Sequence, residues 1–173
     1  TFIYVGGYSI IKGFPIVLKL FTELYKQGLR FRLYMVGNYK NLKHRIPSTL
    51  PIKILGKISH AKILELYKEA WALLFPSICE EPLPYAIIES CLNMVIPVAS
   101  NVGGIPEILE GTKAYEFLFD PFNLESFQEK IETVIAMEKH QVIDVGVDIR
   151  DKVRRKITRS LRTATELLRK IIV

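Results

Sequence analysis

Short apolar runs alternate along this chain with longer segments in which apolar residues recur every three or four positions. The runs have the length of buried strands, and most of them stop at a glycine, a proline or a polar residue. We expect six strands, at residues 2–6, 31–37, 52–56, 71–76, 95–100 and 115–119. We expect helices at residues 14–27, 59–70, 84–93, 103–109 and 124–135, and a last, basic helix within residues 144–173. This alternation predicts an α/β fold, a doubly wound (Rossmann-like) parallel sheet of about six strands with helices on both faces.

Residues that favour helix ends support these boundaries. Pro15 falls in the first turn of its helix, where a missing N–H has no partner to lose. Gly28 follows the last apolar position of the same helix and fits a C-terminal cap. Ser59 fits an N-terminal cap. The capping residues and the apolar pattern therefore agree.

Turn residues follow five of the six expected strands. In an open parallel sheet, ligands bind beyond the carboxyl ends of the strands, where turns and helix N-termini converge. The turns that we expect at this edge are Gly6-Gly7, Gly37-Asn38, Gly56, Glu80–Pro84 and Gly103-Gly104. We expect any ligand site there.

The segment PSICEEPLPYAIIES places two carboxylates at this edge. Glu81 lies in the turn before a helix that starts near Pro84, and Glu89 lies within two turns of that helix start. Both point to one rim if the apolar residues of the helix face inward, namely Ile87, Ile88, Cys91 and Leu92. A helix N-terminus binds phosphate, and carboxylates accept hydrogen bonds from sugar hydroxyls. The arrangement suits a nucleotide sugar; the alternative is that both glutamates only stabilise the helix dipole.

Composition adds one unusual feature, a basic C-terminal end. The 173 residues suit one globular domain, and no apolar run is long enough to span a membrane. The net charge is +6, but residues 150–173 hold nine Lys or Arg and two acids, so residues 1–149 carry about −1. We expect this segment to form an amphipathic helix that packs its apolar stripe on the sheet. Alternatives are binding to an anionic membrane surface and, less favoured because aromatic residues are not interleaved, binding to nucleic acid. The stripe comprises Val153, Ile157, Leu161, Ala164, Leu168 and Ile171.

The cysteines and histidines suggest no separate chemistry. Two cysteines make neither a disulfide framework nor a zinc site, and we expect Cys79 and Cys91 to be small core residues. None of the three histidines pairs with an evident nucleophile. We expect His44, His60 and His140 in a loop, at a helix start and at a helix end, exposed to solvent.

Several of these segments together resemble the retaining GT-B glycosyltransferases of family 4. PSICEEPLPYAIIE resembles the family's Pro-Ser pair followed by Glu-x7-Glu, with Glu81 and Glu89 as the two glutamates. YVGGYSIIKGF is similar to its first strand, glycine turn and Lys-Gly, and LYMVG and IKILGKIS to its next two strands. LYKEAWALLFPS and ASNVGGIPEIL resemble the segments on either side of the glutamate motif. The resemblance covers residues 2 to about 140.

The resemblance implies the donor-binding half of a two-domain enzyme that transfers a hexose from a UDP- or GDP-sugar to a glycan, lipid or protein. It implies a nucleotide-sugar-binding domain at residues 1–143, which the basic helix expected from the charge and apolar pattern at 144–173 would follow. It also implies an N-terminal acceptor domain that this chain lacks and that would be its partner. It assigns Glu81 to the transferred sugar, Glu89 to the ribose, and Lys12 with the turn backbone to the diphosphate; Glu81 and Lys12 are the catalytic residues. It implies that neither a cofactor nor a metal is required. We expect a cytoplasmic protein, with peripheral attachment to a membrane as an alternative. The remaining donor-binding residues that it implies are Gly6, Gly7, Leu83, Pro84, Tyr85, Ala86, Gly103, Gly104 and Glu107, the last of which equally fits an ordinary first-turn glutamate.

The sequence also departs from the family pattern. Gly7 replaces the arginine that usually pairs with the lysine, and Lys40 is a candidate substitute. Pro84 and Met94 each replace a glycine, and Ile96 replaces a proline. Losing one cation beside a diphosphate weakens leaving-group stabilisation. We therefore keep a second hypothesis, a non-catalytic binding or scaffold domain, and expect no turnover from this chain without its N-terminal domain.

Overall fold

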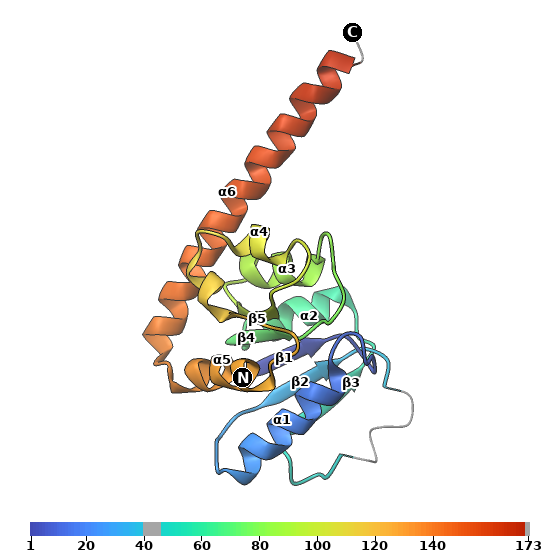
Figure 1. Cartoon of the computed structure of the whole chain (residues 1–173), viewed down its shortest axis with the longest axis vertical. Coiled ribbons are helices and arrows are strands. Elements are labelled where there is room, and N and C mark those ends of the chain that lie inside the picture. The colour runs from blue at the N-terminus through green and yellow to red at the C-terminus, as the bar shows by residue number, and fades with distance from the viewer. Residues whose placement is uncertain (40–45, 172–173) are drawn as a thin grey trace.

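A single six-stranded parallel sheet forms the centre of the protein (Figure 1). The structure, a computed structural model, describes residues 1–39 and 46–171. The strand order is β3-β2-β1-β4-β5-β6, and every neighbouring pair is parallel. The strands are β1 (Phe2–Val5), β2 (Leu33–Val36), β3 (Ile52–Gly56), β4 (Ala72–Phe75), β5 (Ile96–Ser100) and β6 (Leu118–Phe119). The expected doubly wound α/β fold is confirmed.

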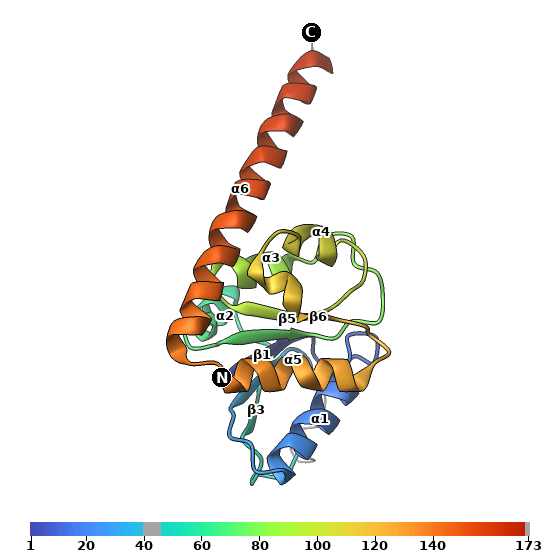
Figure 2. The same ribbon diagram turned by 60° about the vertical axis from the view of Figure 1, so that its left-hand side comes forward.

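Helices cover both faces of this sheet (Figure 2). One layer contains α1 and α5, and the other contains α2, α3, α4 and η1. The last helix, α6, packs along the second layer, against α3, α4 and η1. The bounds are α1 (Phe14–Lys26), α2 (His60–Tyr67), α3 (Tyr85–Leu92), α4 (Ile105–Leu109), η1 (Lys113–Phe117), α5 (Leu124–Ala136) and α6 (Lys139–Ile171).

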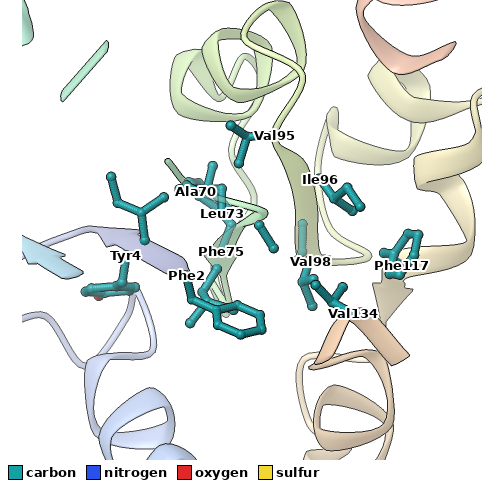
Figure 3. Packing of buried hydrophobic residues seen from close by; sticks show 14 of the residues in the cluster. Phe2, Tyr4, Ala70, Leu73, Phe75, Val95, Ile96, Val98, Phe117 and Val134 are labelled. Carbon is teal, nitrogen blue, oxygen red and sulfur yellow. The ribbon is translucent and has the colours of Figure 1, made fainter. Parts of the chain in front are cut away.

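The core lies between the sheet and these two layers. Phe2 and Tyr4 of β1, Phe75 of β4 and Val98 of β5 are all buried, and Phe2 lies close to Phe75 and Val98 (Figure 3). These strands are nearly continuous apolar runs because both faces of a parallel sheet are covered. Burial therefore determines the positions of the central strands, and because the strands are parallel, their carboxyl ends lie at the same edge of the sheet.

The expected helix caps are confirmed. Pro15 lies in the first turn of α1, and Gly28 follows its last turn with φ +86°. The Ser59 side chain accepts a hydrogen bond from the Lys62 backbone N–H at the start of α2. These local signals succeed because they depend only on neighbours in the sequence.

The expected strand at residues 115–119 is largely wrong. Its first part belongs to the 3₁₀ helix η1, and only Leu118–Phe119 form β6. The Thr112 hydroxyl caps η1 by accepting the Ala114 N–H at 3.2 Å. The cap turns the chain into a helix, although Phe117 and Phe119 are as buried as strand residues.

The C-terminal part of the long helix α6 extends beyond the rest of the protein (Figures 1 and 2). Val153 is buried and Ile157 packs against the core. Leu161 and Leu168 are 64% and 57% exposed, so the expectation that the whole stripe packs on the domain is wrong for its distal part. The side chain of Ile171 lies outside the described residues. The boundary between a domain at residues 1–143 and a separate C-terminal helix stays a prediction. Among the described residues, no helix is both long and apolar enough to cross a bilayer.

The turn between α3 and β5 contains an unusual backbone. Met94, where the resemblance places a glycine, has φ +63°. L-residues rarely adopt this left-handed conformation. Gly146 of α6 faces it, and a Cβ at position 146 would lie 2.6 Å from the Met94 carbonyl oxygen. Met94 is thus accommodated by a residue on another element, and Arg150 Nη1 lies 3.2 Å from its sulfur.

Candidate functional site

The turns after the strands meet at the carboxyl edge of the sheet, as expected. The turns after β1 and β2 are joined by a hydrogen bond from the Tyr8 N–H to the Asn38 carbonyl, 2.8 Å long. The Gly37 N–H donates to the Gly56 carbonyl at 2.9 Å, which adds the end of β3. Backbone hydrogen bonds between different turns fix their relative positions. The edge is therefore one connected surface.

The turns after β1, β4 and β5 are connected in the same way. The Ile78 N–H donates to the Ile11 carbonyl at 2.9 Å, and the Gly104 N–H donates to the Glu81 carbonyl at 3.0 Å. A Cβ at Gly103 would lie only 2.6 Å from the Glu81 backbone nitrogen. The glycine pair is thus needed for close approach of the two turns, and it places their backbones against Glu81.

Lys12 and Glu81 face each other across these turns. Lys12 Nζ lies 3.7 Å from Glu81 Oε1, and the two side chains are 45% and 22% exposed. The Ser77 hydroxyl donates to the same carboxylate at 3.4 Å. At 3.7 Å the ion pair is loose, so both groups can exchange their partner for a ligand. A cation and a carboxylate that the sequence proposed for one site are therefore brought together.

Glu89 also has a partner at this edge, which the sequence did not indicate. His60 Nε2 lies 2.9 Å from Glu89 Oε1, and the side chains are 62% and 35% exposed. His60 is exposed at a helix start, as expected, but it contacts a candidate site residue. A role for Glu89 in ligand binding would fail if it were locked in an internal ion pair. Both partners remain open to solvent, so this pair does not close the site.

The N-terminal end of α3 lies between the two carboxylates in sequence. Ile87 and Cys91 are buried as expected, whereas Leu92 is 39% exposed, which corrects its inward assignment. Pro84 is the N-cap residue and gives no side-chain cap. The first N–H groups of an α-helix have no intrahelical partners, so those of α3 are candidates for anion binding. Beside them, Leu83 and Tyr85 are exposed and Ala86 is half-buried.

Gly7 occupies a position where a side chain does not fit. Its φ is +63°, and a Cβ there would lie 2.9 Å from the Asn38 backbone nitrogen. The preceding residue, Gly6, also faces a crowded space, because its Cβ would lie 2.5 Å from the Tyr4 hydroxyl. The turn after β1 thus contributes backbone at both glycines, and an arginine at position 7 would require a different turn.

The other predicted residues have simpler environments. The Glu107 side chain is exposed in the first turn of α4, and its backbone carbonyl accepts a hydrogen bond from Lys156 Nζ at 2.8 Å. Cys91 is buried, and burial raises the pKa of its thiol to about 12. Cys79 is only half-buried, with its sulfur 3.3 Å from the Ser77 hydroxyl, so its assignment to the core is wrong.

The remaining expectations concern Lys40, two histidines and a metal site. Lys40 and His44 lie outside the described residues. His140 lies at the start of α6, whereas a position at the C-terminal end of a helix was expected, and its Nδ1 is 3.2 Å from Glu138 Oε2. Among residues 1–39 and 46–171, no group of three or more His, Cys, Asp or Glu side chains is placed to hold a metal ion.

Comparisons with known proteins agree with this architecture. The family described as "Glycosyl transferases group 1" matches residues 1–143. No curated protein matches the sequence. Among solved structures, a glycosyltransferase from Rickettsia africae ESF-5 is 21% identical with a TM-score of 0.77, and the match covers 99% of this chain and 47% of that one. Sucrose-phosphate synthase from Thermosynechococcus elongatus is 20% identical with a TM-score of 0.78, covering 99% and 45%.

A third solved structure carries ligands. HepE of Anabaena, in complex with UDP and glucose, is 18% identical with a TM-score of 0.70, and the match covers 94% of this chain and 48% of that one. At these identities the likeness shows the fold. This chain spans about half the length of the structures that it matches.

Proposed function

Since this chain belongs to the group 1 glycosyl transferases, we propose that its carboxyl-edge site binds a nucleoside-diphosphate sugar. In the longer protein, the site serves transfer of a hexose from a UDP- or GDP-sugar to an acceptor with retention of configuration. The observation that carries the proposal is the meeting of Lys12 and Glu81, from the turns after β1 and β4, at one edge of the sheet. Another structure of HepE is in complex with UDP-glucose, which is a nucleoside-diphosphate sugar.

Lys12 and Glu81 have complementary roles in this proposal. When a donor binds, the Lys12 ammonium exchanges its loose contact with Glu81 for the diphosphate, whose negative charge grows as the sugar leaves. Glu81 is then free to accept hydrogen bonds from hydroxyls of the transferred sugar. The first N–H groups of α3, at Tyr85 and Ala86, assist Lys12 because a helix N-terminus carries partial positive charge.

Glu89 is proposed to hold the ribose. It is less than half exposed and lies on α3, beyond the turn that contains Glu81. A carboxylate accepts hydrogen bonds from two adjacent hydroxyls, and the 2′ and 3′ hydroxyls of a ribose are such a pair. Glu81 and Glu89 then bind sugars on either side of the diphosphate.

The alternative function is nucleotide binding without turnover. Gly7 favours it, because the turn after β1 supplies no cation at this position and its backbone excludes a side chain there. Both functions require the donor site, so a binding measurement tests the site. Donor hydrolysis or transfer by the longer protein separates the enzyme from the binding domain.

To test the site, the 173-residue chain is titrated with UDP and with GDP, and binding is monitored by ¹H–¹⁵N NMR. A hydrogen bond to a charged group contributes about 1.5–3 kcal/mol, so Glu89→Ala is expected to weaken binding of the recognised nucleotide by about 10- to 100-fold. Glu129→Ala, on exposed α5 surface, is the matched control and should leave binding unchanged. Unchanged affinity in Glu89→Ala would contradict the ribose assignment, and absence of binding by both nucleotides would contradict the site.

The exposed end of α6 is proposed to pack on another domain of the longer protein. Helical spacing places Leu161 and Leu168 within a quarter turn of the buried Val153. A partner of Leu161 and Leu168 must therefore bind the same face of α6 that packs on this domain. A folded domain fits beside this domain on that face better than a flat bilayer does. Flotation of the chain with anionic liposomes tests the membrane alternative: co-flotation that salt reverses would favour a membrane and contradict the domain partner.

A further inference from the structure

His60 of α2 lies beside Glu89 of α3. His60 Nε2 is 2.9 Å from Glu89 Oε1, although the residues are 29 positions apart in sequence. Tyr67, two turns further along α2, is almost fully buried, and its hydroxyl has no hydrogen-bond partner among the described residues. Burial, and then the charge of Glu89, raise the pKa of this hydroxyl. The Glu89 carboxylate therefore contacts the start of α2.

The contact with His60 has a defined polarity. An ionised carboxylate only accepts hydrogen bonds, so the imidazole must donate from Nε2. A carboxylate has about four acceptor sites, of which His60 uses one on Oε1. Oε2 and the remaining site on Oε1 stay available. The histidine therefore does not compete with a pair of ribose hydroxyls for the carboxylate.

The contact does restrict the carboxylate. A glutamate side chain that is free in solution loses rotamer freedom when it binds a ligand. A supporting hydrogen bond that holds the side chain before binding reduces this loss and sets the plane of the carboxylate. His60 is itself placed by the backbone, because it is the first residue of α2 and follows the Ser59 cap. The support therefore comes from a fixed helix end.

We propose that His60 is a positioning residue that orients Glu89 for the 2′ and 3′ hydroxyls of the donor nucleoside. This inference rests on the proposed function. His60 acts through Glu89 and does not touch the reacting atoms. Its contribution should therefore depend on the presence of the two hydroxyls in the ligand, which gives it a readout that a loss of folding would not produce.

The experiment compares ligands with and without those hydroxyls. The 173-residue chain and its variants are titrated by NMR with UDP and GDP, and each is compared with its 2′,3′-dideoxy counterpart. His60→Ala is expected to weaken binding of the recognised ribonucleotide by about two- to fivefold, the range of an exposed side-chain pair, and to leave binding of the dideoxy counterpart unchanged. His60→Gln keeps an N–H donor and should restore most of the affinity.

His140→Ala is the matched control, because His140 is also an exposed histidine beside a glutamate but lies at the start of α6. It should change neither affinity. Equal weakening of both ligands by His60→Ala would assign His60 a structural role and overturn the inference, as would unchanged ribonucleotide affinity or failure of the glutamine to rescue.

Failure of the inference and failure of the proposed function give different results. If Glu89→Ala abolishes the preference for the ribonucleotide and His60→Ala does not reduce it, only the role of His60 is overturned. If Glu89→Ala leaves the preference intact, the ribose assignment of Glu89 fails and the role of His60 fails with it. Absence of binding by both ribonucleotides overturns both proposals.

Discussion

Replacing Gly7 by alanine is expected to destabilise the protein by about 2–5 kcal/mol, for two separable reasons. The left-handed backbone of Gly7, with φ +63°, costs an L-residue about 1–2 kcal/mol. The new Cβ would also lie 2.9 Å from the nitrogen and 3.1 Å from the oxygen of Asn38. Both are backbone atoms, which cannot rotate away as a side chain can. Relieving such crowding by moving the chain costs about 1–3 kcal/mol.

Gly28→Ala isolates the first of these costs. Gly28 has φ +86°, and a Cβ there would meet no atom within 4 Å. This variant should therefore lose only about 1–2 kcal/mol. Urea denaturation followed by circular dichroism measures both variants, and equal m-values in the two would show that only stability has changed. Equal losses in the two variants would refute the reasoning, because they would show that the turns after β1 and β2 move apart at no cost.

Two further predictions concern α6, and thermal denaturation measures both. Lys156 Nζ donates to backbone carbonyls at the end of α4 at 2.8 and 2.7 Å, so Lys156→Met should lose about 1–2 kcal/mol, or about 2–8 °C in Tm. Arg159→Met, on the exposed part of α6, is its control, and an equal shift in the control would contradict the role of Lys156. Gly146→Ala should lower stability by about 1–2 kcal/mol, although alanine favours helices, because its Cβ would lie 2.6 Å from the Met94 carbonyl oxygen. A rise in Tm would show that α6 can shift away from this turn.

The sequence predicts the fold well wherever burial and local capping act together. β1, β4 and β5 are apolar runs covered on both faces, and α1 has a proline at its start and a glycine after its end. Prediction fails at residues 115–117, where the run has strand-like character but the Thr112 cap starts a 3₁₀ helix. It also fails for Leu161 and Leu168, because the apolar spacing of a helix does not say how far the domain beneath it extends.

The candidate site is only partly predictable, for a related reason. Glu81 and Lys12 could be placed at one edge because the carboxyl ends of parallel strands are aligned, whatever the side chains do. The contact between His60 and Glu89 depends on how α2 and α3 pack, and a single exposed histidine after a helix cap gives no sign of it. Likewise, the close approach of Gly146 to the left-handed Met94 becomes evident only once α6 is placed against the turn before β5.

The charge balance at the edge explains why the nucleotide affinity of this chain is expected to be low. Lys12 already faces Glu81, so an incoming diphosphate must compete with a carboxylate for one ammonium group. The N-terminal end of α3 adds only a partial positive charge, equivalent to about half a unit, and Gly7 adds none. These groups neutralise only part of a diphosphate, and a leaving group needs such neutralisation most at the transition state. On the proposed function, we therefore expect turnover to require a further cation, from another part of the longer protein or from Lys40. Without that cation, we expect the site to bind a nucleotide and not to cleave the bond between the sugar and the diphosphate.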